Sequence, residues 1–312
     1  MSARAASRPD ASGGPAGALA AAGVALRAED LITLRRLALS AEADPILAAL
    51  PGGFVTRRRG HGQEVADVRD YVAGDDIRHL DRGATARRGS LHVRQFQEDR
   101  DRVTLLVADM RPAMLWGTRR AFRSVAVAEA LALIGWRAVE EGGRVGLLAI
   151  GSGAPEAVPP RGRTRGMLEV IGGLVRAHAA ALQRAAGGAE TEPELSRSLS
   201  RIERLAPRGA EVVIASGFDT PGPDLGECLG DLARTRVPRL VRIDDGGLAA
   251  LPRGRYPIRL PDGSRRVVTG GGSTTPEAGP IAGRPVLTLD AGETPEATSR
   301  RIVAAFPRDR EP

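Results

Sequence analysis

The sequence predicts an α/β fold, in which a doubly wound and mostly parallel sheet occupies the middle of the chain. Short apolar runs recur at residues 103–109, 144–150, 211–216 and 237–243. Continuous apolar runs are typical of parallel strands that are buried on both faces. Helical patterns separate these runs, and strands that alternate with helices pair in parallel.

The N-terminal part divides into a tail and a helical segment. Residues 1–26 are rich in Ala, Gly, Ser and Pro, a composition that cannot bury enough apolar surface to order itself, so we expect a disordered tail. From residue 27 onward, Asp30 can cap a helix whose leucines lie on one face, and a second short helix can follow Pro45. We assign residues 27–102 to this helical segment and the polar block that follows it.

The predicted α/β domain covers residues 103–244. After the first strand we expect, in order, a helix at 118–141, strands at 144–150 and 156–159, helices at 164–181 and 193–205, a strand at 211–216, a helix at 225–234 and a strand at 237–243. The helix at 118–141 is apolar nearly all round in its middle, which suits burial against a sheet. Gly142 and Gly143 end it.

The composition changes again after Asp244, where Pro, Gly and polar residues dominate. Residues 255–260 and 265–269 flank a turn sequence and predict a β-hairpin. A terminal helix is expected at 294–306. We therefore predict that residues 245–312 form a small β-rich appendage.

The charge and cysteine content limit the function classes. The chain has 45 basic residues, all arginine, against 38 acidic residues, and only 3% aromatic residues. This mild and interleaved positive charge, with few aromatic side chains, does not favour nucleic-acid binding. Cys228 is the only cysteine, and no segment has the roughly 20 apolar residues of a membrane span. We expect a cytoplasmic protein with no membrane insertion.

The block at residues 57–102 has a dense mixture of arginines and acids that a core strand would not have. One interpretation is a solvated loop and hairpin, with surface ion pairs that contribute at most about 1 kcal/mol each. The other is a network in which arginine forks hold an extended segment across the domain. Residues 90–96 alternate polar and apolar side chains and predict a half-exposed strand in either case.

The spacing of residues in this block resembles that of the bacterial DUF58 family. The matching positions are Arg58, Gly60, Gly62, Glu64, Arg69, Tyr71, Gly74, Asp75, Asp76, Arg78, Asp81, Ala86, Arg87, Gly89, Leu91, Val93, Arg94, Phe96, Glu98 and Arg100. Two positions depart from the family pattern, because Arg82 stands where Trp is usual and Val65 where Phe is usual.

The resemblance implies a von Willebrand factor A-like domain after the block. Such domains often hold a divalent cation through Asp-x-Ser-x-Ser at the end of the first strand, but this chain has Asp109, Arg111 and Ala113 there. Gly217 stands where a second acid would be expected, with Asp219 two residues later. Arg111 can place a guanidinium group beside Asp109, and its charge would oppose metal binding. We therefore expect no metal site and no cofactor, with Asp109 in a salt bridge or a helix cap.

No catalytic constellation emerges from the sequence, so we do not expect an enzyme. The resemblance implies a scaffold or adapter that works with a MoxR-type AAA+ ATPase, and with other von Willebrand factor A-type proteins, on a client protein. Two alternatives stay open. One is a metal-dependent ligand-binding domain in which Asp109 and Asp219 converge; the other is a hydrolase that uses Asp75, Asp76 and Asp81 around a cation.

Overall fold

The computed structural model describes residues 19–40, 64–72, 80–97, 102–188, 191–248, 251–259, 265–270 and 279–306 of the chain. The chain forms two compact units. Residues 55–101 make up one of them, the signature unit. Residues 1–54 and 102–312 make up the other, the sheet unit.

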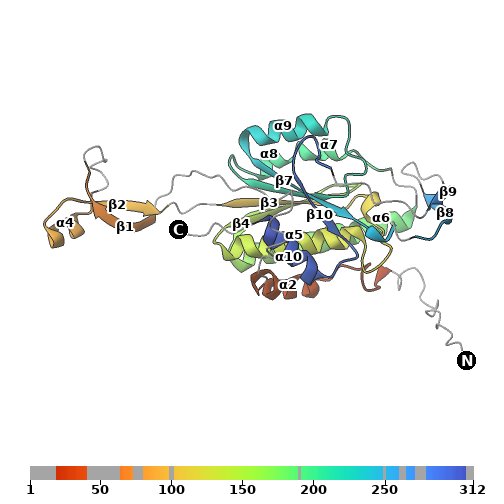
Figure 1. The fold of residues 1–312 in the computed structure, drawn as a ribbon, viewed down its shortest axis with the longest axis horizontal. Coiled ribbons are helices and arrows are strands. Elements are labelled where there is room, and N and C mark those ends of the chain that lie inside the picture. Colours follow the sequence, from red (N-terminus) through yellow and green to blue (C-terminus); the bar gives the residue numbers. More distant parts are fainter. Residues whose placement is uncertain are drawn as a thin grey trace, which may run out of the picture. The chain divides into compact units, whose positions relative to one another are not determined.

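A mostly parallel sheet of six strands is the centre of the sheet unit (Figure 1). Its strands, in spatial order, are β10 (Val286–Asp290), β7 (Val237–Asp244), β6 (Glu211–Ser216), β3 (Val103–Asp109), β4 (Arg144–Ile150) and β5 (Glu156–Gly162). Neighbouring strands are parallel except for β5, which runs antiparallel to β4. Pro159 and Pro160 lie in β5, at the edge of the sheet, where the missing N–H groups break no central hydrogen bonds. The predicted mixed α/β class is confirmed.

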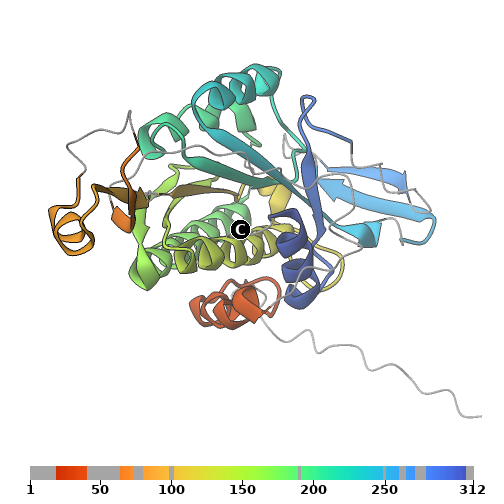
Figure 2. The same cartoon turned by 60° about the vertical axis from the view of Figure 1, so that its left-hand side comes forward.

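Helices cover both faces of this sheet (Figure 2). On one face are α5 (Arg123–Glu140), α6 (Arg163–Gly187) and α10 (Pro295–Ala305); on the other are α7 (Leu195–Leu199), α8 (Ile202–Leu205) and α9 (Leu225–Thr235). Because successive side chains of a strand point to opposite faces, Leu106 joins the first core and Leu105 the second. The predicted helix at 193–205 is in fact the two short helices α7 and α8.

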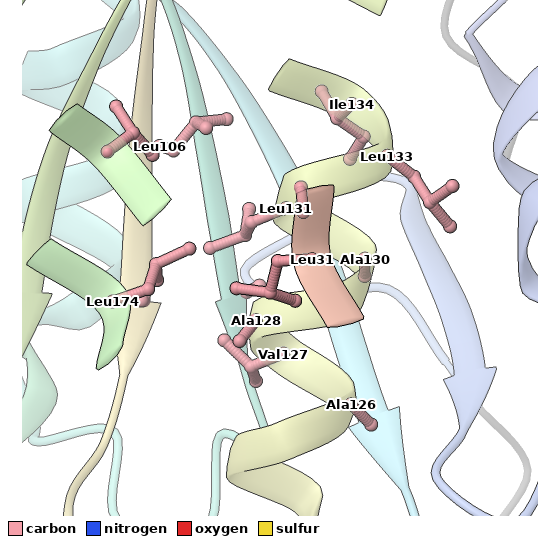
Figure 3. Close-up of a cluster of buried hydrophobic side chains, with 14 of the residues drawn as sticks. Leu31, Leu106, Ala126, Val127, Ala128, Ala130, Leu131, Leu133, Ile134 and Leu174 are labelled. Atoms are coloured by element: carbon pink, nitrogen blue, oxygen red, sulfur yellow. The ribbon is translucent and has the colours of Figure 1, made fainter. Parts of the chain in front are cut away.

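Helix α5 is buried on nearly all sides because it lies between the sheet and a further layer of helix. That layer includes α2 (Ala28–Ser40), which the sequence predicted to pack on the main domain. Trp136 of α5 donates a hydrogen bond from Nε1 to the backbone oxygen of Leu31 in α2 at 3.0 Å. Figure 3 shows Leu31 of α2 in front of α5, with Leu106 of β3 and Leu174 of α6 beside it. The second helix predicted after Pro45 falls outside the described residues.

The predicted disordered tail over residues 1–26 extends too far. Leu26 is buried, and the backbone oxygen of Gly23 accepts a hydrogen bond from the N–H of Phe122 at 2.8 Å. Gly23 has a φ of 78°, and a Cβ there would lie 2.1 Å from the backbone oxygen of Arg120. Composition alone does not reveal such a close fit to the rest of the fold. Residues 1–18 are outside the described part of the chain.

The predicted C-terminal appendage over residues 245–312 also needs correction. Strand β10 pairs in parallel with β7, and Ile302 and Val303 of α10 are buried in the sheet unit. Five residues with a distant parallel partner give little local signal, so the strand was missed. Within this region, β8 (Gly254–Arg259) and β9 (Arg265–Gly270) form a separate two-stranded sheet, close to the predicted hairpin.

In the signature unit, β1 (Glu64–Asp70) pairs antiparallel with β2 (His92–Gln97), and α4 (Arg82–Arg88) lies between them in sequence. The predicted domain over residues 27–102 therefore divides, because α2 belongs to the sheet unit. Strand β2 agrees with the strand expected at 90–96, whereas β1 and α4 were not predicted. In the described ranges, no helix combines the length and apolar character needed to cross a bilayer.

Candidate functional site at the carboxyl edge of the sheet

The strand order of the sheet reverses between β3 and β6. Strands β4 and β5 follow β3 toward one edge, whereas β6, β7 and β10 extend toward the other. In open α/β sheets, ligands bind at such a switch point, beyond the carboxyl ends of the strands. Asp109 ends β3 and Ser216 ends β6, so both residues lie at this point.

The Asp109 carboxylate is fully engaged by protein groups. Its Oδ1 accepts hydrogen bonds from the backbone N and Nε of Arg111, at 3.0 and 2.9 Å. Its Oδ2 accepts from Nη2 of Arg111 at 2.7 Å and from Oγ of Ser216 at 2.6 Å. The two side chains of this ion pair are each only 1% exposed. Arg111 thus places its guanidinium group on the carboxylate that would otherwise face a cation.

The far end of the Arg111 guanidinium group joins β3 to two other segments. Nη1 donates to the backbone oxygens of Pro193 at 2.6 Å and Thr220 at 2.8 Å. Burial by itself would lower the pKa of Arg111, but the hydrogen bond and charge of Asp109, together with the charges of Glu192 and Asp219, outweigh it and raise that pKa above its ordinary value. Arg111 therefore remains charged and acts as a fixed cation inside the protein.

Glu192 is a second buried carboxylate at this edge. Its Oε2 accepts a hydrogen bond from the backbone N of Ala113 at 2.9 Å, and its Oε1 lies 3.4 Å from Nη1 of Arg111. Oε1 is buried without a hydrogen bond, and the side chain is 1% exposed. Burial raises the pKa of Glu192 to about 7, against the opposing effects of Ala113 and Arg111. This group therefore titrates near neutral pH.

Arg123 is a second buried arginine at the same edge. Its Nε donates to the backbone oxygen of Ile243 at 2.8 Å, and its Nη1 donates to Oδ2 of Asp219 at 2.9 Å. A Cβ on Gly217 would lie 1.7 Å from Nη2 of Arg123, so the missing side chain at position 217 leaves room for this guanidinium group. Asp219 and Asp109 are thus paired with different arginines instead of converging on one site.

The Arg123 guanidinium group also stacks on a tryptophan. Its Cζ lies 5.5 Å from the centre of the Trp116 ring, within the range of cation–π attraction. The chain has two tryptophans; Trp136 is 1% exposed in the core, whereas Trp116 is half-buried. The carboxyl edge therefore presents an aromatic ring beside the exposed Asp219.

The donor set at this edge does not fit a divalent cation. A hard cation requires free carboxylate or hydroxyl oxygens, but both oxygens of Asp109 already accept hydrogen bonds, and Arg111 adds a positive charge. Across the described part of the chain, no three His, Cys, Asp or Glu residues are grouped so that they could hold a metal ion. A nucleophile paired with a base is likewise not evident among these residues. Chemically, the arrangement is a set of paired charges, in which Glu192 is the group that titrates near neutral pH.

The structure describes some of the predicted residues of the signature block, and the others lie outside its described ranges. Glu64 and Arg69 lie in β1, opposite Gln97 and Val93 of β2, and Arg94 of β2 lies opposite Val68. Tyr71 follows β1, and its N–H donates to the backbone oxygen of Leu91 at 2.8 Å. The predicted residues that lie outside the described part of the chain are Gly74, Asp75, Asp76, Arg78, Glu98 and Arg100.

Asp81 has a clear structural role as the N-cap of α4. Its Oδ1 accepts a hydrogen bond from the backbone N of Ala84 at 2.8 Å, and its own N–H donates to the backbone oxygen of His92 at 2.8 Å. Arg87 lies exposed in the last turn of this helix, where its charge complements the helix dipole. Asp81 therefore connects α4 to β2.

Sequence reasoning missed Glu192 and Arg123. Arg123 carried a usable signal, because it is a charge directly before the apolar run of α5, and a charge buried there requires a partner. Glu192 lies in a polar loop, and its local sequence gives no sign of burial. Only the contact with Ala113, 79 residues away in the chain, brings it into the site.

Comparisons with known proteins give a family but no activity. Residues 67–266 match the family model described as "Protein of unknown function DUF58". Uncharacterised proteins of Mycobacterium bovis and Mycobacterium tuberculosis are 36% identical over 102 residues, which is 33% of this chain. The chain spans 32% of the length of these curated relatives.

Among solved structures, the conserved hypothetical protein BatB from Bacteroides thetaiotaomicron is similar at a TM-score of 0.39 and 12% sequence identity. The match covers 64% of this chain and 97% of that one.

Proposed function

The chain belongs to the DUF58 family, whose function is unknown, and we propose on this premise that it is a non-catalytic adapter. In this proposal, the sheet unit is von Willebrand factor A-like and binds a MoxR-type AAA+ ATPase in the cytoplasm. Together with other von Willebrand factor A-type proteins, the two act on a client protein. The family resemblance suggests the partner, and the carboxyl edge of the sheet supplies the surface that would meet it.

The observation that carries the proposal is the closure of the carboxyl edge by two arginines. Arg111 pairs with Asp109 and Arg123 pairs with Asp219, so neither of these carboxylates is left for a cation, and Glu192, the third carboxylate of this edge, is buried with its side chain 1% exposed. What the edge offers outward is the half-buried ring of Trp116 and the exposed carboxylate of Asp219. Tryptophan is enriched among the few residues that dominate the binding energy of protein interfaces.

The von Willebrand factor A-like assignment is supported by the strand arrangement. The first strand of the sheet, β3, is central and ends in Asp109, the position at which the resemblance puts a metal-binding acid. The metal-dependent alternative has less support, because Asp109 and Asp219 are paired with different arginines. The hydrolase alternative loses Asp81 to helix capping.

The test is direct binding between the purified chain and the MoxR-type ATPase of the same organism, with ATP and magnesium and then with a chelator. Trp116→Ala should weaken the complex by about tenfold or more. Leu168→Ala, an exposed apolar residue of α6, is the matched control and should bind like the parent. Thermal melting of both variants checks that the fold is retained. If no complex forms, or if Trp116→Ala binds as tightly as the parent, the proposal is wrong.

A further inference from the structure

The described part of the β8–β9 ribbon contains several exposed arginine side chains. The described residues of this region, 251–259 and 265–270, contain five arginines and no acid. Arg253, Arg255, Arg265 and Arg266 are all exposed, and none of them has an ion pair within the part of the chain that the structure describes. Elsewhere in the sheet unit, some exposed arginines, such as Arg165 and Arg176, are paired with acids.

The pairing register of the ribbon brings arginine positions together on one face. Arg259 and Arg265 occupy directly opposite positions on the two strands, and Arg255 is four residues before Arg259 on β8. Side chains alternate between the two faces of a strand, so these three positions share a face. A guanidinium fork binds a carboxylate in two parallel hydrogen bonds, so this face suits an anionic ligand.

Apolar side chains lie between the charged positions of the same face. Pro257 is opposite Val267, and the next pair on that face toward the strand end is Arg255 with Thr269. Both Pro257 and Val267 are exposed, and Val267 is 56% exposed. A ligand that covers this face must therefore offer apolar contacts between its negative charges.

We infer that the β8–β9 ribbon is a docking surface for an acidic segment of a partner protein, in which Asp or Glu residues alternate with apolar ones. An extended strand of this kind matches the spacing of a six-residue ribbon strand, which is about 20 Å long. None of the ribbon residues named above belongs to the carboxyl edge, so binding of an acidic peptide can be tested separately from binding of the ATPase.

Nucleic acids and anionic membranes fit the ribbon less well than an acidic peptide does. The major groove of duplex DNA admits a two-stranded ribbon, but a phosphate backbone has no apolar group to cover Pro257 and Val267. Stacking on single-stranded nucleic acid needs an aromatic ring beside the positive charges, and Tyr256 lies between Arg255 and Pro257 in β8 and therefore on the opposite face of the ribbon. Membrane-surface segments use Trp, Phe or Leu for insertion, and strands β8 and β9 contain none of these.

The experiment measures fluorescence anisotropy of a labelled peptide of Glu-Val-Asp-Val repeats, titrated with the full chain. Arg255→Glu/Arg265→Glu should weaken binding by about tenfold or more, because two favourable charges become repulsive. Arg201→Glu/Arg208→Glu changes the net charge equally at exposed positions of the sheet unit and should weaken binding by less than about twofold. Val267→Ser should weaken binding by about threefold, which would show the apolar contact.

Several results would overturn the inference. One is that the peptide does not bind the parent. Another is that both charge-reversed variants lose the same amount of affinity for the peptide, which would mean that only the net charge matters. A short DNA duplex and phosphatidylserine vesicles serve as competing probes. If either binds more tightly than the peptide and is lost on Arg255→Glu/Arg265→Glu, the ribbon recognises that partner instead. The neutral variant Arg255→Gln/Arg265→Gln replaces the charge reversal should the latter fail to fold.

Discussion

Arg111 is the residue on which the carboxyl edge depends most. Its guanidinium group bonds Asp109 and the backbone oxygens of Pro193 and Thr220, so it ties β3 to two loops that are distant in sequence. A buried charge that loses its partner is much more costly than an exposed one, because water cannot take the partner's place.

We predict that Arg111→Met lowers the free energy of unfolding by about 3–5 kcal/mol, since Asp109 would keep a buried charge with only Ser216 as a side-chain donor. Urea unfolding measures this change. Arg176→Met removes an ion pair whose arginine is 62% exposed and should cost at most about 1 kcal/mol. Equal effects in the two variants would show that Arg111 is not a structural cation.

Glu192 gives the protein a pH-dependent stability. Its pKa is raised by burial from 4.5 to about 7, so the folded protein binds this proton more tightly than the unfolded chain does. Stability should therefore fall as pH rises from about 4.5 to about 7, with a loss on the order of 3 kcal/mol.

We predict that Glu192→Gln flattens the dependence of the unfolding free energy on pH across this window. Urea unfolding at several pH values between 4.5 and 8 measures it, with each stability compared with that of the parent at the same pH. Glu203→Gln is the control, because Glu203 is exposed and should leave the slope of the parent unchanged. A slope that persists in Glu192→Gln would assign the titration to another group.

At the level of elements, the sequence was informative where a strand is buried on both faces. The predicted limits of β3, β4 and β6 agree with the structure, because each is one unbroken apolar run. Strand β10 is a short edge strand whose side chains are mostly half-buried, so its pattern resembles that of a loop.

The candidate site was likewise predictable only in part from the sequence. The proximity of Arg111 to Asp109 follows from their two-residue spacing at a strand end. Glu192 and Arg123 reach the site from a loop and a helix, and only the tertiary fold brings them there. The proposed absence of a metal site remains a prediction that these contacts support.

Helix α4 depends on its N-cap. Asp81→Ala should destabilise the signature unit by about 1 kcal/mol, because the N–H of Ala84 loses its acceptor. Hydrogen exchange of the α4 amides measures the change. Asp81→Asn keeps an acceptor oxygen at the same position and should retain most of the protection. If Asp81→Ala exchanges like the parent, the cap does not stabilise this helix.

At the level of the whole molecule, the two units have separate interiors. Neither hydrophobic core of the sheet unit includes a described residue of the signature unit. The residues that enclose the sheet come from both sides of the signature unit in sequence, since α2 precedes it and β3 follows it.

We predict that replacing residues 55–101 by a flexible Gly/Ser linker leaves a cooperative thermal transition in the sheet unit, within a few degrees of the parent. Calorimetry measures this transition. A chain that ends at residue 285 is the contrasting variant, because it lacks β10 and the buried face of α10, and it should lose the cooperative transition. Loss of the transition in the linker variant would mean that the sheet unit needs the signature unit to fold.

The contact of Trp136 with Leu31 has a consequence for the order of events at the ribosome. The two residues are 105 positions apart, and protein synthesis adds about 5–20 residues each second. Helix α2 therefore leaves the ribosome roughly 5 to 20 seconds before the helix that covers its apolar face. During that interval all of the signature unit leaves the ribosome. The signature unit can therefore fold before α5 is available to cover the apolar face of α2.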